Sequence, residues 1–198
     1  MKLNILIVGV GGQGALTTAA IIARAAMRAG LNVITAETHG MAQRGGSVEV
    51  HVRIGDVKAP LIPDGGADVA IVLEPSEILR YAKYLNEKTL VILNDRPVIP
   101  PLVSAGLGKY PSLEEVVESI RGITQNVTVV SASKIAEELG NVQAANVVVM
   151  GMLLAYAKMP FSYEQIEDAL KEVLPEKLWD INLKALNIGF KSVQPSGE

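Results

Sequence analysis

Short apolar runs and amphipathic segments alternate along most of the chain. The segment 3–8 is a continuous run of branched apolar residues, a pattern typical of a strand buried on both faces of a parallel sheet. Glycines interrupt this run, and the alanine-rich segment 15–28 then predicts a helix that Gly30 ends. The same reasoning predicts further strands at 32–37, 47–54, 68–73, 89–93 and 127–130, and helices at 75–85, from 112 onward, and at 133–139, 144–158, 163–173 and 177–187.

This order of elements predicts an α/β fold with a Rossmann-like open, mostly parallel sheet flanked by helices, and a helical C-terminal extension. The first three elements form a β–α–β unit, whose crossover we expect to be right-handed. A length of 198 residues suits one domain. We therefore expect a single domain over 1–198, with 141–198 as its helical C-terminal part.

The segment 47–54 alternates between apolar and polar side chains. Glu49, His51 and Arg53 fall on the polar side of this predicted strand. Such alternation predicts a sheet face that is open to water or to a partner. We accordingly expect His51 to be a solvent or interface residue.

The proline-rich segment 94–111 and two helix starts stand out in the second half of the chain. Loops as long as 94–111 are uncommon inside domains and tend to be functional or to cover another element. Ser112 with Glu115, and Ser162 with Gln165, have the spacing of capping boxes, in which each side chain satisfies a backbone donor of the other residue.

The most apolar stretch, 144–157, is about 14 residues long, whereas a membrane span needs about 20. It predicts a buried core helix. The first residues lead directly into the strand 3–8 and its glycines, and they do not resemble a targeting segment. We expect a cytoplasmic protein that does not associate with a membrane.

Composition excludes several kinds of site. The chain has no cysteine, which excludes disulfides, Cys-ligated zinc and Cys-held iron–sulfur clusters, and its two histidines cannot form a histidine-rich metal site. A formal charge of -3 argues against a nucleic-acid binder. We predict no metal site and no catalytic residue in this chain.

A glycine-rich turn directly follows the first strand. Gly9, Gly11 and Gly14 fit the pattern G-x-G-x-x-G, with Gly12 and Gln13 between them, and Glu37 ends the next predicted strand. Position and spacing match the dinucleotide-binding fingerprint, in which the acid binds a ribose. The alternative is that these glycines only allow a strand to turn into a closely packed helix. Glu37 would then cap a turn.

A second glycine-rich loop, 38–46, follows at the carboxyl end of the second strand, where open α/β sheets bind ligands. Arg44 is its strongest candidate, because core packing does not explain an arginine beside glycines. The two loops together could hold an anion, or they could form a flat surface against another subunit. The candidate residues here are His39, Gln43, Arg44, Gly45, Gly46 and Ser47.

These motifs resemble those of the γ-type domain of 2-oxoacid:ferredoxin oxidoreductases. The run Gly11–Gly14 after a strand is shared across that family. The run His39–Ser47 resembles more specifically the β subunits of indolepyruvate ferredoxin oxidoreductases. The segments Leu73–Glu77, Asn94–Val98 and Asn182–Ala185 are also similar to those subunits.

The resemblance implies a role in an enzyme that oxidatively decarboxylates aryl 2-oxoacids to aryl-acyl-CoA and reduces ferredoxin. Thiamine diphosphate, Mg and [4Fe–4S] clusters would then lie on a large α subunit, with coenzyme A as cosubstrate and α2β2 as the assembly. No cofactor is expected to be bound in this chain alone. Two alternatives stay open: a freestanding NAD(P)-binding Rossmann enzyme and a nucleotide-sensing module.

Overall fold

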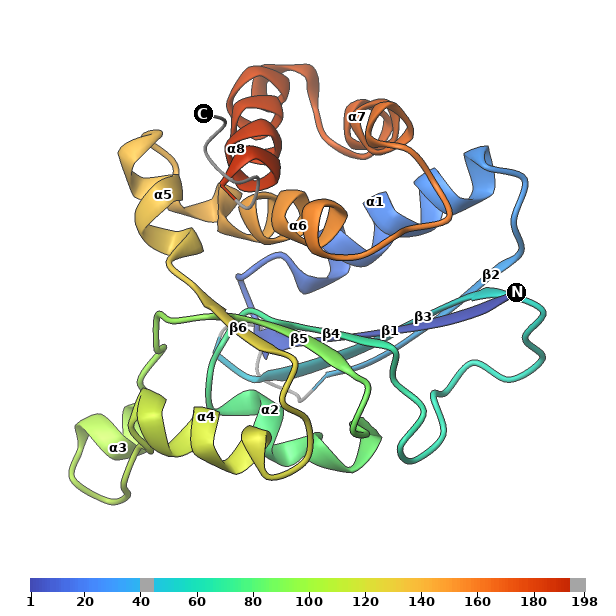
Figure 1. Cartoon of the computed structure of the whole chain (residues 1–198). Coiled ribbons are helices and arrows are strands. Elements are labelled where there is room, and N and C mark those ends of the chain that lie inside the picture. Colours follow the sequence, from blue (N-terminus) through green and yellow to red (C-terminus); the bar gives the residue numbers. More distant parts are fainter. Residues whose placement is uncertain (40–44, 193–198) are drawn as a thin grey trace, which may run out of the picture.

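The computed structural model describes residues 1–39 and 45–192, except for the side chain of His39. Six described strands form one sheet in the order β2-β3-β1-β4-β5-β6 (Figure 1). Three neighbouring pairs, β1–β4, β4–β5 and β5–β6, are parallel, whereas β3 runs antiparallel to both β1 and β2. The strands are β1 (Lys2–Val10), β2 (Val33–His39), β3 (Ser47–Gly55), β4 (Val69–Val72), β5 (Leu90–Asn94) and β6 (Val127–Val130).

The predicted α/β fold is confirmed, but β1 and β2 are not neighbours. The antiparallel strand β3 lies between them and pairs with both along its length. A parallel neighbour of β2 would need a crossover connection of about a dozen residues or more. The segment 40–46 is too short for that, so β3 returns antiparallel and the sheet is mixed.

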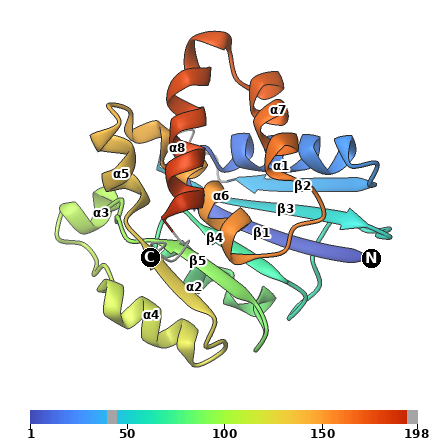
Figure 2. The same cartoon turned by 45° about the horizontal axis from the view of Figure 1, so that its top comes forward.

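Helices cover both faces of the sheet (Figures 1 and 2). One face carries α1 (Ala15–Arg28), α5 (Ala132–Glu138), α6 (Ala145–Tyr156), α7 (Tyr163–Val173) and α8 (Trp179–Lys191). The other carries the shorter α2 (Glu77–Arg80), α3 (Pro101–Ser104) and α4 (Leu113–Arg121). Three 3-10 turns connect these elements: η1 (Ala82–Tyr84), η2 (Val142–Ala144) and η3 (Glu176–Leu178).

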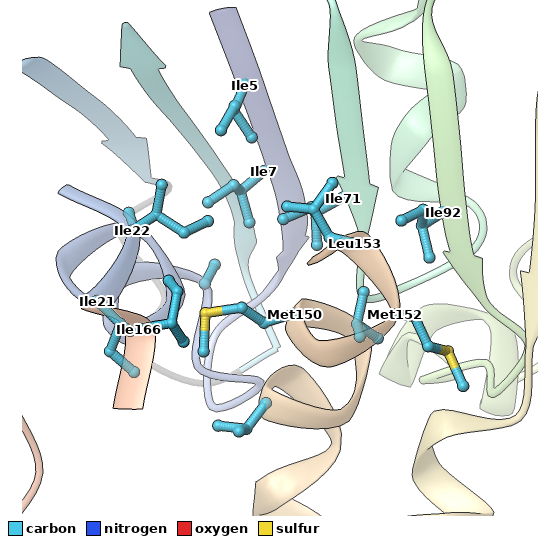
Figure 3. Close-up of a cluster of buried hydrophobic side chains, with 14 of the residues drawn as sticks. Ile5, Ile7, Ile21, Ile22, Ile71, Ile92, Met150, Met152, Leu153 and Ile166 are labelled. Atoms are coloured by element: carbon cyan, nitrogen blue, oxygen red, sulfur yellow. The ribbon is translucent and has the colours of Figure 1, made fainter. Parts of the chain in front are cut away.

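The helix α6 lies in the middle of the larger hydrophobic core (Figure 3). Met150 and Leu153 are almost fully buried and belong to the same cluster as Ile7 of β1 and Ile22 of α1. The prediction of a buried core helix here is therefore confirmed. Of the C-terminal helices, α8 packs against α6 and α7 packs against α1.

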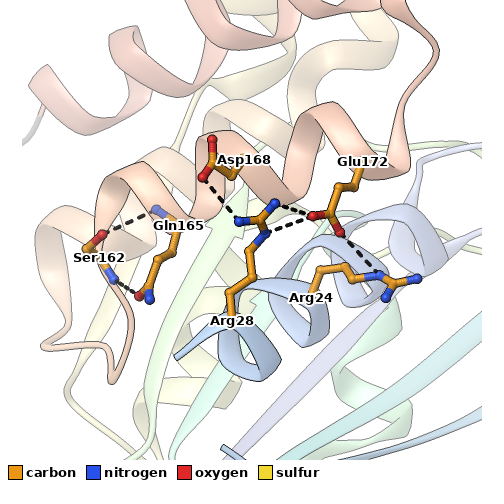
Figure 4. Close-up of polar contacts among 6 residues, drawn as sticks. All are labelled: Arg24, Arg28, Ser162, Gln165, Asp168 and Glu172. Atoms are coloured by element: carbon orange, nitrogen blue, oxygen red, sulfur yellow. Dashed lines mark hydrogen bonds and ion pairs between the residues drawn. The ribbon is translucent and has the colours of Figure 1, made fainter. Parts of the chain in front are cut away.

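Ion pairs join α7 to the solvent side of α1 (Figure 4). Arg28 Nε donates to Glu172 at 2.8 Å and Arg28 Nη1 to Asp168 at 3.3 Å, and Arg24 Nε lies 3.6 Å from Glu172. Exposed pairs such as these contribute little stability. The capping box at Ser162 is present, as is the one at Ser112.

The single helix expected at 75–85 was wrong. The structure has α2 and the turn η1 instead, because Tyr81 between them leaves the helical conformation with φ −113°. The segment 94–111 is mainly irregular, as predicted, and contains the short helix α3.

The open polar face predicted for β3 was also wrong. Glu49, His51 and Arg53 are buried because the segment 56–66 folds over them. His51 Nε2 lies 2.8 Å from Glu49, and its Nδ1 accepts a backbone N–H from the segment 59–62 at 3.1 Å. Arg53 donates to two backbone carbonyls of the same segment, at 2.6 and 2.9 Å. The alternation of β3 thus marks a buried polar layer.

The buried side chain of Tyr84 packs against this polar layer. Its ring lies edge-on to His51, with the ring centres 5.0 Å apart. Burial and the neighbouring Glu49 carboxylate disfavour the phenolate and raise the pKa of Tyr84 to about 12. Tyr84 is therefore neutral throughout the physiological range.

Candidate functional site

The first glycine loop lies where β1 ends and α1 begins (Figure 1). Gly12 and Gly14 have φ of 98° and 81°, values in the left-handed region that favours glycine. A Cβ at Gly14 would also lie 2.6 Å from Nδ2 of Asn146, which donates to the Gly14 carbonyl and to Thr18 Oγ1. Gly14 is therefore fixed both by its conformation and by contact with α6.

The side chain of Gln13 bridges the crevice between the carboxyl ends of β1 and β4. Its Oε1 accepts the Val10 N–H at 2.9 Å, and its Nε2 donates to the Leu73 carbonyl at 3.0 Å. A Cβ at Gly9 would lie 2.8 Å from that Oε1. Doubly wound sheets usually bind nucleotides at such a crevice. In this chain a side chain of the loop itself occupies that position.

The two glycine-rich segments are in direct contact. The Gly11 N–H donates to the Gly46 carbonyl at 2.9 Å, and Gly45 N–H reaches the Gly11 carbonyl at 3.4 Å. The Ser47 hydroxyl donates to the Glu77 carboxylate and lies 2.7 Å from the Tyr81 hydroxyl. Ser47 thus serves contacts within this chain.

Three of the expected site groups cannot be placed. Gln43, Arg44 and the side chain of His39 lie outside the described residues. The backbone of His39 ends β2 opposite Val48.

Glu37 is separated from the first glycine loop by an entire strand. It pairs with Val50 of β3, and Val50 pairs in turn with Ile7 of β1. Two strand spacings put Glu37 about 10 Å from β1. In the dinucleotide fold the acidic residue follows a strand that neighbours β1. The insertion of β3 therefore removes Glu37 from the ribose position.

A cavity of about 440 Å³ opens beside the N-terminus of α1. Its wall is formed by residues 10–12, the first helical turn at 14–17, amide side chains from the segment 141–146, and Asn182. No side chain caps α1, and the N–H groups of residues 15–17 have no acceptor among the described residues. Free N–H groups at a helix N-terminus favour an anionic group.

Asn146 is the site residue that the sequence analysis missed. It holds the glycine loop from a position 132 residues away along the chain. The one available signal was a buried-type helix that contains an amide side chain in its first turn.

The family model of pyruvate ferredoxin/flavodoxin oxidoreductases matches residues 4–192 of this chain. The chain belongs to this family. Indolepyruvate oxidoreductase subunit IorB of Archaeoglobus fulgidus is 66% identical over 96% of this chain and 94% of that protein. The subunit of the same name from Pyrococcus horikoshii is 43% identical over 96% of each chain. The common γ subunit of the pyruvate/ketoisovalerate oxidoreductases of Pyrococcus abyssi is 30% identical.

Solved structures of the oxidoreductase family share the fold. The γ subunit of a keto/oxoacid ferredoxin oxidoreductase from Geobacter sulfurreducens aligns with a TM-score of 0.70 at 24% identity, over 96% of this chain and 98% of that one. The 2-oxoglutarate:ferredoxin oxidoreductase of Magnetococcus marinus aligns with a TM-score of 0.72 at 23% identity. It covers 98% of this chain but 31% of its own, so the same fold occurs there within a longer chain.

Membership of the oxidoreductase family does not favour a freestanding NAD(P) enzyme. The hydrogen bonds of Gln13 across the crevice and the separation of Glu37 from the first glycine loop do not favour one either. In the described part of the chain there is no group of three or more His, Cys, Asp or Glu side chains placed to hold a metal ion. Within the same residues, no helix is both long and apolar enough to cross a membrane.

Proposed function

We propose that this chain is the β subunit of an indolepyruvate:ferredoxin oxidoreductase. This enzyme would oxidatively decarboxylate aryl 2-oxoacids to aryl-acyl-CoA and reduce ferredoxin. The observation that carries the proposal is the 66% identity to subunit IorB of Archaeoglobus fulgidus over almost the whole of both chains. The run 39–47, which includes Arg44, supports the same assignment.

The composition of this chain agrees with a division of labour between two subunits. Thiol chemistry and Cys-held clusters need cysteine, and this chain has none. In line with the family resemblance, the proposal places thiamine diphosphate, Mg and the [4Fe–4S] clusters on a large α subunit, in an α2β2 assembly. Ferredoxin would be reached through that subunit. Such an assembly would work in the cytoplasm, where coenzyme A and ferredoxin are found.

Within this assembly, the two glycine loops would shape the interface with the α subunit and hold phosphates of coenzyme A. The exposed first turn of α1 beside a cavity of about 440 Å³ supports the phosphate role. Crowding of the crevice by Gln13 opposes a nicotinamide nucleotide at the usual position.

Affinity capture of the tagged chain from its native source tests the assembly. We expect a large iron–sulfur subunit to co-purify, and the complex to reduce ferredoxin when given indolepyruvate and coenzyme A. Recovery of the chain without such a partner would contradict the proposal. A rise of several degrees in the melting temperature with NAD, NADP or FAD would instead support the Rossmann-enzyme or sensor alternative.

The phosphate role is tested with Arg44→Ala in the assembled enzyme. Loss of one charge-assisted contact should weaken coenzyme A binding by about tenfold in calorimetry. The exposed Arg121→Ala on α4, which lies on the other face of the sheet, serves as the matched control. Equal coenzyme A affinity in Arg44→Ala and the control would rule out a phosphate contact by Arg44.

A further inference from the structure

The strand β2 forms an unusually open edge of the sheet. It spans seven residues, Val33–His39, and pairs with β3 alone in the described sheet. Natural edge strands are usually short, or are protected by proline, lysine or a bulge. The opposite edge, β6, has four residues. By contrast, β2 is longer and contains neither proline nor lysine, so its outer N–H and C=O groups can accept another strand.

The helix α1 carries an apolar flank on the same side of the molecule. Leu16, Ala20, Ala23 and Met27 are spaced by four, three and four residues, which places them in one row along the helix. Leu16 is 43% exposed and Met27 is 56% exposed. The other side of α1 is occupied by α7 through the ion pairs of Arg24 and Arg28, as Figure 4 shows. The row is therefore left uncovered by the residues that the structure describes.

The middle of the apolar row on α1 lies alongside the middle of the strand β2. In Figures 1 and 2, α1 lies over the sheet edge formed by β3 and β2 and runs in the direction opposite to β2. The helix of 14 residues is about 21 Å long and the strand of seven residues about 23 Å. A short turn at 29–32 joins their adjacent ends. The middle of the row, between Ala20 and Ala23, thus lies alongside the middle of the strand at Ala36.

This surface is complementary to itself. An antiparallel strand edge pairs with an identical edge related by a twofold axis. The row reads large, small, small, large, so an antiparallel second row would bring the alanines together at the centre and place Leu16 opposite Met27. The charge on β2 also permits this pairing. Glu37 is the one Asp, Glu, Lys or Arg residue of β2, and in a pairing centred on Ala36 it faces Thr35 of the second copy. Within β2, no like charges face each other across the axis.

We propose that two copies of this chain associate through the edge of β2 and the outer row of α1, about a twofold axis at Ala36. This inference goes beyond the proposed function and does not rest on it. The shared surface is about 20 Å long and two elements wide, which is small for a stable interface. We therefore expect a dimer with a dissociation constant of about 1–100 μM for the isolated chain.

Single cysteines test the axis directly, because the natural chain has none. In the proposed pairing, Ala36 faces itself with a Cα separation of about 5 Å, within the range that a disulfide spans. Ala36→Cys should form a covalent dimer under mild oxidation. Thr38→Cys is the matched control: it lies on the same strand and the same face, yet its two copies would be about 13 Å apart, so it should stay monomeric. Equal cross-linking of the two variants, or none at Ala36→Cys, would overturn the proposal.

A charge in the row gives an independent test in solution. Met27→Glu should weaken the dimer at least tenfold in sedimentation velocity and leave the circular dichroism unchanged, because Met27 is exposed. Leu107→Glu is the control, since Leu107 is 76% exposed and follows α3, which lies on the other face of the sheet. If Met27→Glu leaves self-association intact, or if it blocks only capture of the large subunit, the second copy is not the occupant of this surface.

Discussion

Replacing Gly189 by alanine should lower the free energy of unfolding by about 3 kcal/mol or more, at the upper end of the range for overpacked cores. Within a helix, alanine is normally favoured over glycine by about 1 kcal/mol. Helix propensity alone would thus predict an increase in the free energy of unfolding, whereas we expect a decrease.

The reason is the crossing of α6 and α8. A Cβ at Gly189 would lie 2.1 Å from the Val148 carbonyl oxygen, and a Cβ at Gly151 would lie 2.2 Å from that of Leu186. Each glycine therefore lies against the backbone of the other helix. Backbone inside a helix cannot shift by an ångström without breaking its hydrogen bonds, so the helices would have to separate. Separation would expose the fully buried side chains of Val148 on α6 and Leu186 on α8.

Urea unfolding followed by the fluorescence of Trp179, the single tryptophan, would measure this change. Gly151→Ala should have a similar effect. Gly108→Ala is the matched control, because its nearest neighbour would be an ordinary contact at 3.6 Å, and it should change stability by less than about 0.5 kcal/mol. Stability of Gly189→Ala equal to that of the control would show that the helices do not depend on this close approach.

The sequence predicts those parts of the fold that local patterns determine. The run 3–8 is a buried strand and 127–130 is a strand, both as expected, and the helix 15–28 has the predicted bounds. Both capping boxes involve residues three positions apart. Such elements are determined by residues that are close together in the sequence.

Features that depend on distant contacts were missed. The alternation of β3 was correctly assigned to a strand, but which face is covered depends on the segment 56–66. The role of Gln13 depends on Leu73, and that of Gly14 on Asn146. Gly11 and Gly46 are in contact because the end of β1 lies beside the start of β3, a pairing that the sequence analysis did not predict.

Glu74 should be the polar side chain whose replacement has the largest effect. It is 1% exposed and accepts four hydrogen bonds. Ser76 Oγ and the Glu77 N–H donate to one carboxylate oxygen at 2.7 and 3.1 Å, and the Val98 N–H and the Tyr110 hydroxyl donate to the other. Burial and this carboxylate raise the pKa of Tyr110, so that its hydroxyl stays protonated as a donor.

Glu74→Gln keeps the shape of this side chain but turns an NH2 group toward two of the four donors. Hydrogen bonds to a buried charged group contribute about 1.5–3 kcal/mol each, and unpaired donors add a desolvation cost. We expect a loss of about 3 kcal/mol in the free energy of unfolding. Because Val98 and Tyr110 lie near the two ends of the segment 94–111, that segment should open first, with faster hydrogen exchange and cleavage by added protease.

Two further variants separate this effect from a simple change of charge. Tyr110→Phe removes one donor and should cost about 1.5 kcal/mol, while Glu87→Gln removes an exposed carboxylate and should be nearly neutral. If Glu74→Gln matched Glu87→Gln, and exchange within 94–111 were unchanged, Glu74 would not anchor the segment. The ordering expected from the contacts is Glu74→Gln, then Tyr110→Phe, then Glu87→Gln, because they disrupt two, one and none of the buried hydrogen bonds.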